Sequence, residues 1–266
     1  MSGHLSASAP QPRRRTAPSL GFRFLLANDL HHGEPACDAF FQGLVTQMRT
    51  HAAIDFCLLA GDLTDRGLPE SLASMRRIFS GLGVLVHTVP GNHDNDTAGD
   101  TSLYNREFPE ALNRVFHHKG WQFIGLDTTD GTAWQNTRIG PHTLSFLDAT
   151  VPNLDPRAPT VVFTHFPLAP GVFMRPVNAD AALALLAPLN LRAVLCGHFH
   201  GRTLHPRGAA ILSTGTCCAR LRSNHDGTAP EGYQVCTANP DGTVTQDFFE
   251  YTPATENPPP PTIALV

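Results

Sequence analysis

Short apolar runs in this chain repeatedly end in a cluster of Asp, Asn and His residues. Such runs, bounded by turn residues, are typical of strands that are buried on both faces of a sheet. Five of them end in the polar segments Asn28-Asp29-Leu30-His31, Gly61-Asp62-Leu63-Thr64-Asp65, Gly91-Asn92-His93-Asp94, Thr164-His165 and Gly197-His198-Phe199-His200. Because α/β sheets assemble their sites at the carboxyl ends of strands, the five segments predict one shared functional site.

Helical patterns alternate with these apolar runs. Apolar residues recur at helical spacing after Pro35 as far as Met48, from Pro69 to Phe79, and over 181–186. The alternation predicts an α/β fold. From Ala209 to Tyr251 the helical spacing is lost, and short strands and loops are expected there. The predicted strands are 22–27, 54–60, 84–89, 123–126, 160–163 and 193–196.

The 266 residues predict a single domain over 21–251, because no composition break or internal repeat divides that stretch. Residues 1–20 are rich in Ser, Ala, Pro and Arg and are expected to form a disordered leader. Residues 252–266 include four consecutive prolines and are expected to form a disordered tail.

Composition limits the partners and the compartment. A net charge of −4 provides no global positive field for long nucleic acid or an anionic membrane. No run of apolar residues is long enough to cross a membrane. The six cysteines form no CxxC pair, and Cys57 and Cys196 lie in apolar runs, as expected of buried reduced thiols. A cytoplasmic location is therefore expected, and Arg13-Arg14-Arg15 leaves twin-arginine export as the alternative.

The polar segments carry metal-ligand chemistry. In Asp29-x-His31 and His198-x-His200 an extended backbone would turn both side chains to one side. No thiolate is among the candidates, so Mn, Fe, Zn or Co is expected rather than a structural zinc. Seven oxygen or imidazole donors are too many for one tetrahedral ion and suit two ions that share a carboxylate. The seven candidates are Asp29, His31, Asp62, Asn92, His165, His198 and His200.

The motifs D-x-H, GDxxDRG, GNHD, a later His and GHxH occur in that order from Asp29 to His200. In this order they resemble the calcineurin-like metallophosphoesterase superfamily. The resemblance implies a four-layer α/β/β/α sandwich of two mixed sheets flanked by helices, with a two-metal site at one edge. It assigns one ion to Asp29, His31, Asp62 and His200, and the other to Asp62, Asn92, His165 and His198, so that Asp62 bridges them.

The resemblance also implies roles for three further residues. His93 would stabilise the transition state or protonate the leaving oxygen, and the carboxylate of Asp65 would orient it. Arg66 would contact phosphate or serve another purpose, and both readings stay open. Asp94 is interpreted as a residue that bonds the loop backbone, and His32 as facing solvent or backing the site. The Asn224-His225-Asp226-Gly227 segment is expected to be a loop, with a position over the pocket as the alternative.

The implied activity is hydrolysis of P–O bonds by a metal-bound hydroxide. Small phosphodiesters such as cyclic nucleotides or glycerophosphodiesters are the favoured substrates. One alternative is a phosphomonoesterase of small or protein substrates, and another is a non-catalytic metal-binding scaffold with the same fold. A nuclease is disfavoured because no basic stripe is present. The pocket is expected to be shaped by the segments 95–108, 128–140, 166–178 and 202–232.

Overall fold

The protein is described by a computed structural model, which covers residues 21–109, 112–215, 224–228 and 231–253. The expected leader over 1–20 lies outside the described residues, as does the expected tail from 254 onward. Eleven strands form two mixed sheets within this part of the chain. The described helices are α1 (Asp38–Met48), α2 (Pro69–Ser80), α3 (Ser102–Glu107), α4 (Pro141–Thr150) and α5 (Ala179–Leu185).

The first sheet has the order β11-β10-β1-β2-β3, in which β1, β2 and β3 are parallel and β10 and β11 are antiparallel to their neighbours. Its strands are β1 (Phe22–Ala27), β2 (Ile54–Ala60), β3 (Leu85–Val89), β10 (Gly232–Ala238) and β11 (Val244–Glu250). The last two strands come from the segment in which the sequence loses its helical spacing, which confirms the expected short strands there.

The second sheet has the order β4-β5-β6-β7-β9-β8, with a parallel centre and antiparallel edges. Its strands are β4 (Arg114–His118), β5 (Trp121–Leu126), β6 (Pro159–Thr164), β7 (Asn190–Cys196), β8 (Thr203–Arg207) and β9 (Ala210–Thr214). Both sheets are therefore mixed, as predicted.

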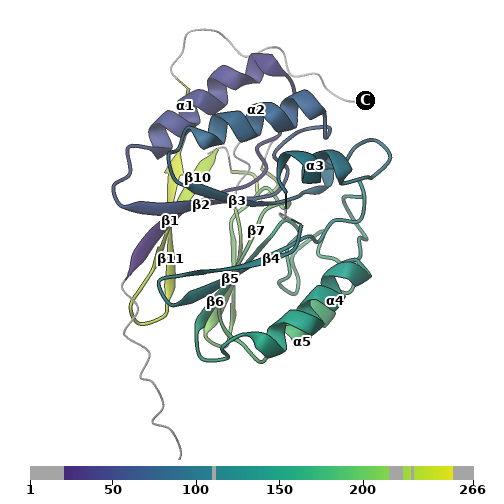
Figure 1. The fold of residues 1–266 in the computed structure, drawn as a ribbon, viewed down its shortest axis with the longest axis vertical. Coiled ribbons are helices and arrows are strands. Elements are labelled where there is room, and N and C mark those ends of the chain that lie inside the picture. The colour runs from purple at the N-terminus through teal and green to yellow at the C-terminus, as the bar shows by residue number, and fades with distance from the viewer. Residues whose placement is uncertain (1–20, 110–111, 216–223, 229–230, 254–266) are drawn as a thin grey trace, which may run out of the picture.

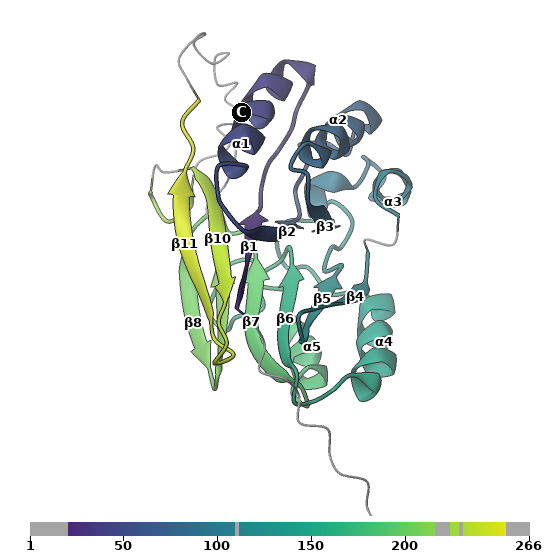
Figure 2. The ribbon, with the colours of Figure 1, turned by 60° about the vertical axis from the view of Figure 1, so that its left-hand side comes forward.

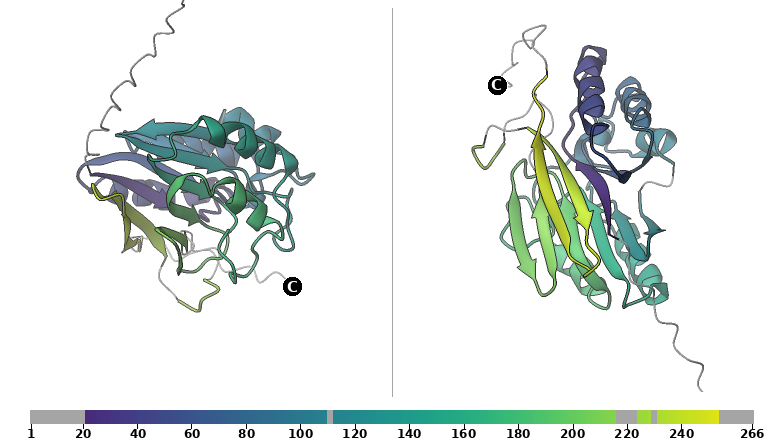
Figure 3. Two further views of the ribbon diagram at one scale, coloured as in Figure 1. Left: turned by 90° about the horizontal axis from the view of Figure 1, so that it is seen from below. Right: turned by 90° about the vertical axis from the view of Figure 1, so that its left-hand side faces the viewer.

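The two sheets lie face to face with helices on their outer sides, which makes four layers (Figures 1, 2 and 3). Three apolar clusters lie between these layers. One cluster packs α1, α2 and Tyr104 of α3 against the first sheet, and a second packs α4 and α5 against the second sheet. The third fills the space between the two sheets. This arrangement confirms the predicted α/β/β/α sandwich.

Successive residues of the central strands enter different clusters. In β1, Phe24 lies between the sheets while Leu25 lies under the helices, and in β2, Leu58 and Leu59 divide in the same way. Because side chains alternate across a strand, a strand that is covered on both faces must be apolar throughout. This requirement explains why the central strands appear in the sequence as continuous apolar runs.

Four of the α-helices and strands, namely β4, β8, α3 and α4, were not predicted from the sequence. Strand β8 is a mostly exposed edge strand that precedes the segment in which short strands were expected. Strand β4 is a partly buried edge strand with the sequence RVFHH, and it carries no continuous apolar run. Helix α3 has only six residues, too few to show a period, and α4 buries only Thr143 and Leu147. Cys57 and Cys196 are buried and unpaired, as predicted, and burial raises the pKa of both thiols. No described helix combines the length and apolarity needed to cross a membrane.

Candidate metal centre

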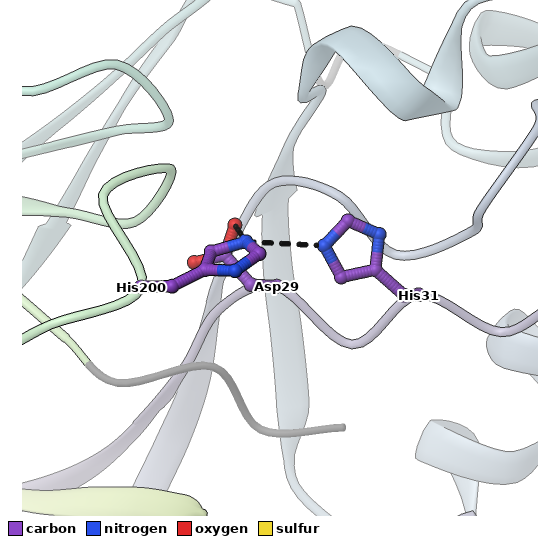
Figure 4. A group of neighbouring side chains, drawn as sticks. All are labelled: Asp29, His31 and His200. Carbon is purple, nitrogen blue, oxygen red and sulfur yellow. Dashed lines mark hydrogen bonds and ion pairs between the residues drawn. The ribbon is translucent and has the colours of Figure 1, made fainter. Parts of the chain in front are cut away.

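The loops that follow β1, β2, β6 and β7 bring buried carboxylates and imidazoles together in two groups. One group consists of Asp29, His31 and His200 (Figure 4), and its ligand atoms lie within 4.8 Å of one another. The other group consists of Asp62, His165 and His198, whose ligand atoms also lie within 4.8 Å of one another. Six of the seven predicted metal ligands therefore converge from loops that are far apart in the sequence.

Contacts within and between the groups are short. His31 Nε2 lies 3.3 Å from His200 Nε2, which lies 3.2 Å from Asp29 Oδ1. In the other group, His165 Nε2 lies 3.2 Å from Asp62 Oδ2 and 3.1 Å from His198 Nδ1. Asp62 Oδ2 also lies 3.7 Å from His31 Nε2, so Asp62 joins the two groups. The resemblance in the motifs assigned the shared carboxylate to the same residue.

Asn92, the seventh predicted ligand, lies beside Asp62. The backbone N–H of the next residue, His93, donates to Asp62 Oδ1 at 2.9 Å. Asn92 Oδ1 is buried and accepts no hydrogen bond from the described residues. A buried polar oxygen without a donor is rare and costly, so this atom fits a cation ligated from this side. The donor set of oxygens and imidazole nitrogens fits the same interpretation.

The backbone at these residues is not extended. Asp29, His31, Asp62, His198 and His200 have φ values of 53°, 48°, 50°, 66° and 46°. The expectation that an extended strand aligns the D-x-H and H-x-H pairs is therefore wrong. Left-handed backbone is uncommon outside glycine and persists where the surroundings impose it. Here the loops bond to each other, with Asp29 N–H donating to Gly61 O at 3.1 Å and His31 N–H to Asp62 O at 2.9 Å.

Backbone carbonyls fix the orientation of two of these imidazoles. His165 Nδ1–H donates to Ala60 O at 3.0 Å, and His198 Nε2–H donates to Trp134 O at 2.7 Å. A carbonyl only accepts, so the opposite nitrogen of each ring faces the centre and is the one available to ligate a cation. Metal-ligating histidines commonly have such a partner behind them. Nothing in the sequence marked the carbonyl of Trp134 for this role, because every residue carries one.

The electrostatics of the centre favour positive charge. Burial lowers the pKa of His165, but the carboxylates of Asp62 and Asp29 outweigh this and raise it to about 9. Burial raises the pKa of Asp29, but the imidazole of His200 outweighs this and lowers it to about 2. Burial, with His165 nearby, lowers the pKa of His198 to about 3. Two ionised carboxylates thus lie among buried imidazoles, and their field stabilises a cation there.

His93 lies at the edge of the centre, with its ring 4.8 Å from that of His31 and its side chain 29% exposed. Its Nδ1–H donates to the backbone carbonyl of Asp65 at 2.8 Å, whereas the Asp65 carboxylate lies 4.0 Å away. That carboxylate is closer to His31 Nδ1, at 3.6 Å. The backbone carbonyl of Asp65 therefore orients His93, whereas the carboxylate of Asp65 was expected to do so. Arg66 is exposed and makes none of these contacts.

Asp94 and His32, which adjoin predicted metal ligands in the sequence, are both buried. Asp94 is fully buried and bonds the loop backbone, as predicted, whereas His32 is buried against Asp38, with Nε2 2.8 Å from Oδ1. The solvent-facing interpretation of His32 is therefore wrong. The 224–227 segment lies against the centre, because His225 N–H donates to His200 O at 2.8 Å and their rings stack at 5.4 Å. The segment is a loop, as expected, and it lies beside His200.

Glycines allow the backbone to lie against the two carboxylates. A Cβ at Gly91 would collide with the carboxylate and the backbone nitrogen of Asp62. One at Gly197 would lie 2.7 Å from Asp29 Oδ2. Real Cβ atoms do not approach other atoms so closely. The glycines of the GNHD and GHxH motifs are therefore required by close packing at the centre.

We expect Asp94→Asn to destabilise the protein by at least about 2 kcal/mol, in the range for buried hydrogen bonds to a charged group. Asp94 Oδ2 accepts from the N–H groups of Leu63 (3.1 Å) and Gly91 (2.9 Å), and Oδ1 accepts from that of Thr64 (2.9 Å). An amide would turn an NH₂ toward one of these donor sets. The measurement is urea unfolding of the metal-free protein.

Asp96→Asn is the matched control for this variant. Only Oδ1 of Asp96 is used, to accept from Ala98 N–H at 2.8 Å and Asp100 N–H at 2.9 Å, and an Asn oxygen can replace it. The control should change the free energy of unfolding by less than about 0.5 kcal/mol. Equal stabilities of the two variants would show that Asp94 does not hold the two loops together.

The sandwich and its buried carboxylate–imidazole centre agree with the class of metallophosphoesterases, to which a family model assigns the chain. A family model described as calcineurin-like phosphoesterase matches residues 22–202, more than half of the chain, so the chain belongs to that family. The resemblance in the motifs is thereby confirmed. The matched segment contains every predicted ligand.

Two curated relatives carry phosphodiesterase names. A 3′,5′-cyclic-nucleotide phosphodiesterase of Nostoc is 31% identical over 114 residues, which cover 43% of this chain and 41% of that protein. A probable cyclic nucleotide phosphodiesterase of Synechococcus is 28% identical over 222 residues, covering 77% and 83% of the two chains. The first match therefore spans less than half of the relative's own length.

Among solved structures, a dimetal phosphatase from Danio rerio has the same fold. It aligns with a TM-score of 0.59 at 15% identity, covering 83% of this chain and 93% of the other. At that identity the likeness establishes the fold of the protein and not its substrate.

Proposed function

We propose that the protein is a dinuclear metal-dependent phosphodiesterase that hydrolyses small phosphodiesters. The observation that carries the proposal is the convergence of six buried His and Asp side chains around Asp62, within a chain of the calcineurin-like phosphoesterase family. A purely structural role for such a centre is disfavoured because the described residues bring no thiolate to it and His93 lies partly exposed beside it.

Two ligand sets are proposed. Asp29, His31 and His200 hold one ion, and Asn92, His165 and His198 hold the other, with Asp62 as the shared ligand. When bound, a pair of such ions supplies a water of lowered pKa and positive charge for the phosphate oxygens. Mn, Fe, Zn and Co are all compatible with these donors.

The residues of the chain itself orient the reacting groups. The Asp65 carbonyl holds His93 by Nδ1–H, which leaves Nε2 to meet an ester oxygen at the exposed edge of the ring. From there His93 protonates the leaving oxygen or stabilises charge on it. Arg66 is exposed next to Asp65 and is proposed to contact a phosphate oxygen at the pocket mouth.

Diesters are favoured over monoesters because the two relatives described above are named for cyclic nucleotide phosphodiesterase activity. The net charge of −4 favours small substrates over long nucleic acid.

Metal removal is the direct test. After dialysis against EDTA, we expect hydrolysis of bis(4-nitrophenyl) phosphate and 3′,5′-cyclic AMP to fall below detection. Addition of Mn, Fe, Zn or Co one at a time should restore it, with about two ions bound per chain by elemental analysis. The monoester 4-nitrophenyl phosphate is assayed in parallel and should be the poorer substrate.

Three other outcomes would contradict the proposal in different ways. Robust hydrolysis of the monoester with none of the diesters would identify a monoesterase. Binding of two ions without hydrolysis of any phosphoester would favour the non-catalytic scaffold. Activity that survives complete metal removal would exclude two-metal chemistry.

A further inference from the structure

Trp134 lies on the loop between β5 and α4, and two hydrogen bonds tie this loop to the candidate centre. Its carbonyl accepts the Nε2–H of His198 at 2.7 Å. Three residues earlier, the carbonyl of Gly131 accepts from Asn95 Nδ2 at 2.7 Å, and Asn95 lies two residues after His93. The segment 131–134 therefore runs from the loop that carries His93 to the imidazole of His198.

The side chain of Trp134 is 50% exposed although its backbone is held in this way. The loop is also fastened to the segment 166–178, since Val177 N–H donates to Thr137 O at 2.9 Å and Asn178 Nδ2 to Ile139 O at 3.0 Å. Val177 is exposed as well. Exposed apolar side chains on two loops that hydrogen-bond to each other beside a catalytic centre are typical of a surface that binds part of a substrate.

We propose that Trp134 is a specificity-determining residue whose indole stacks on a planar aromatic ring carried by the phosphodiester, such as a nucleobase. The inference rests on the proposed function and narrows it, because it favours nucleotide-like diesters over aliphatic glycerophosphodiesters. An indole offers a large flat face, and ring stacking does not depend on which base is bound. The backbone bond to His198 holds the main chain of Trp134 beside the metal ligands.

Steady-state kinetics of Trp134→Ala and Trp134→Phe test the proposal. Both variants keep the backbone carbonyl that holds His198, so their metal content should equal that of the wild type. With 3′,5′-cyclic AMP, Trp134→Ala should lose about 5-fold or more in kcat/KM, at the lower end for base stacking. The loss should fall mainly on KM, because stacking binds substrate and transition state alike.

Glycerophosphoglycerol, an aliphatic diester, is the comparison substrate. The loss that Trp134→Ala causes with cyclic AMP should exceed its loss with glycerophosphoglycerol by at least about 5-fold, and Trp134→Phe should recover part of the difference. Leu85→Ala removes a 72% exposed apolar side chain at the start of β3, at the opposite end of that strand from Asn92, and serves as the matched control. It should alter neither substrate's kcat/KM.

Fluorescence gives a readout that does not need turnover. The chain has two tryptophans, and Trp121 is fully buried, so Trp134 is the one accessible to solutes. We expect adenosine 5′-monophosphate to quench the emission of the metal-loaded protein, and glycerol phosphate to leave it unchanged. Trp134→Phe should abolish the quenching.

The outcomes separate this inference from the proposed function. Equal losses with both diesters, together with no quenching by the nucleotide, would overturn the role of Trp134 while leaving the phosphodiesterase intact. Quenching by the nucleotide in a protein that hydrolyses no phosphoester would support the ring-binding surface and refute the enzyme.

Discussion

Asp62→Asn is expected to lose metal and activity together. The substitution keeps the size of the side chain and an oxygen for the N–H of His93, but it removes the charge that lies between the two groups of ligands. We expect metal affinity to fall by at least about 10²-fold, the upper figure for residues that only support ligands. Hydrolysis of bis(4-nitrophenyl) phosphate should fall by about 10³-fold. Elemental analysis after gel filtration and initial rates measure the two effects.

Asp155→Asn is the control for the loss of one carboxylate. Asp155 lies on the surface, with Oδ1 3.2 Å from Nε of Arg157, and it is remote from the centre in the fold. This variant should keep its metal and its rate. If Asp62→Asn also kept two ions per chain and wild-type turnover, Asp62 would not be the shared ligand.

His93→Asn is expected to keep its metal and to lose at least about 10²-fold in kcat, the lower figure for a general acid. Asn is chosen because its Nδ2 can still donate to the Asp65 carbonyl, as His93 Nδ1 does, while the group corresponding to Nε2 is removed. The measurements are kcat for cyclic AMP and metal content by elemental analysis. His117→Asn, which alters an exposed histidine of β4, is the control and should retain full activity.

A second substrate distinguishes the two roles proposed for His93. A nitrophenolate leaves without being protonated, whereas the alkoxide of a cyclic nucleotide needs a proton. A general acid therefore predicts a much smaller loss with bis(4-nitrophenyl) phosphate than with cyclic AMP. Equal losses with both would assign His93 to charge stabilisation. Near-wild-type turnover by a metal-replete His93→Asn protein would show that His93 has neither role.

Much of the centre was predictable because its chemistry lies in side chains at recognisable places. The donors follow β1, β2, β3, β6 and β7, whose apolar residues are required by burial on both faces. Parallel strands then carry those donors to one edge of the sandwich. The edge strand β4 and the short helix α3 escaped prediction because partial burial and short length leave no periodic pattern.

The sequence by itself determined the order of the motifs, the types of donor atoms and the α/β class, since these follow from side-chain chemistry and from the apolar pattern that burial demands. Only the tertiary structure decided how the donor side chains are oriented. Their left-handed backbone, and the carbonyls of Ala60, Asp65 and Trp134 that orient His165, His93 and His198, depend on main-chain groups. Every residue carries the same carbonyl, so only folding selects which ones become partners of the site.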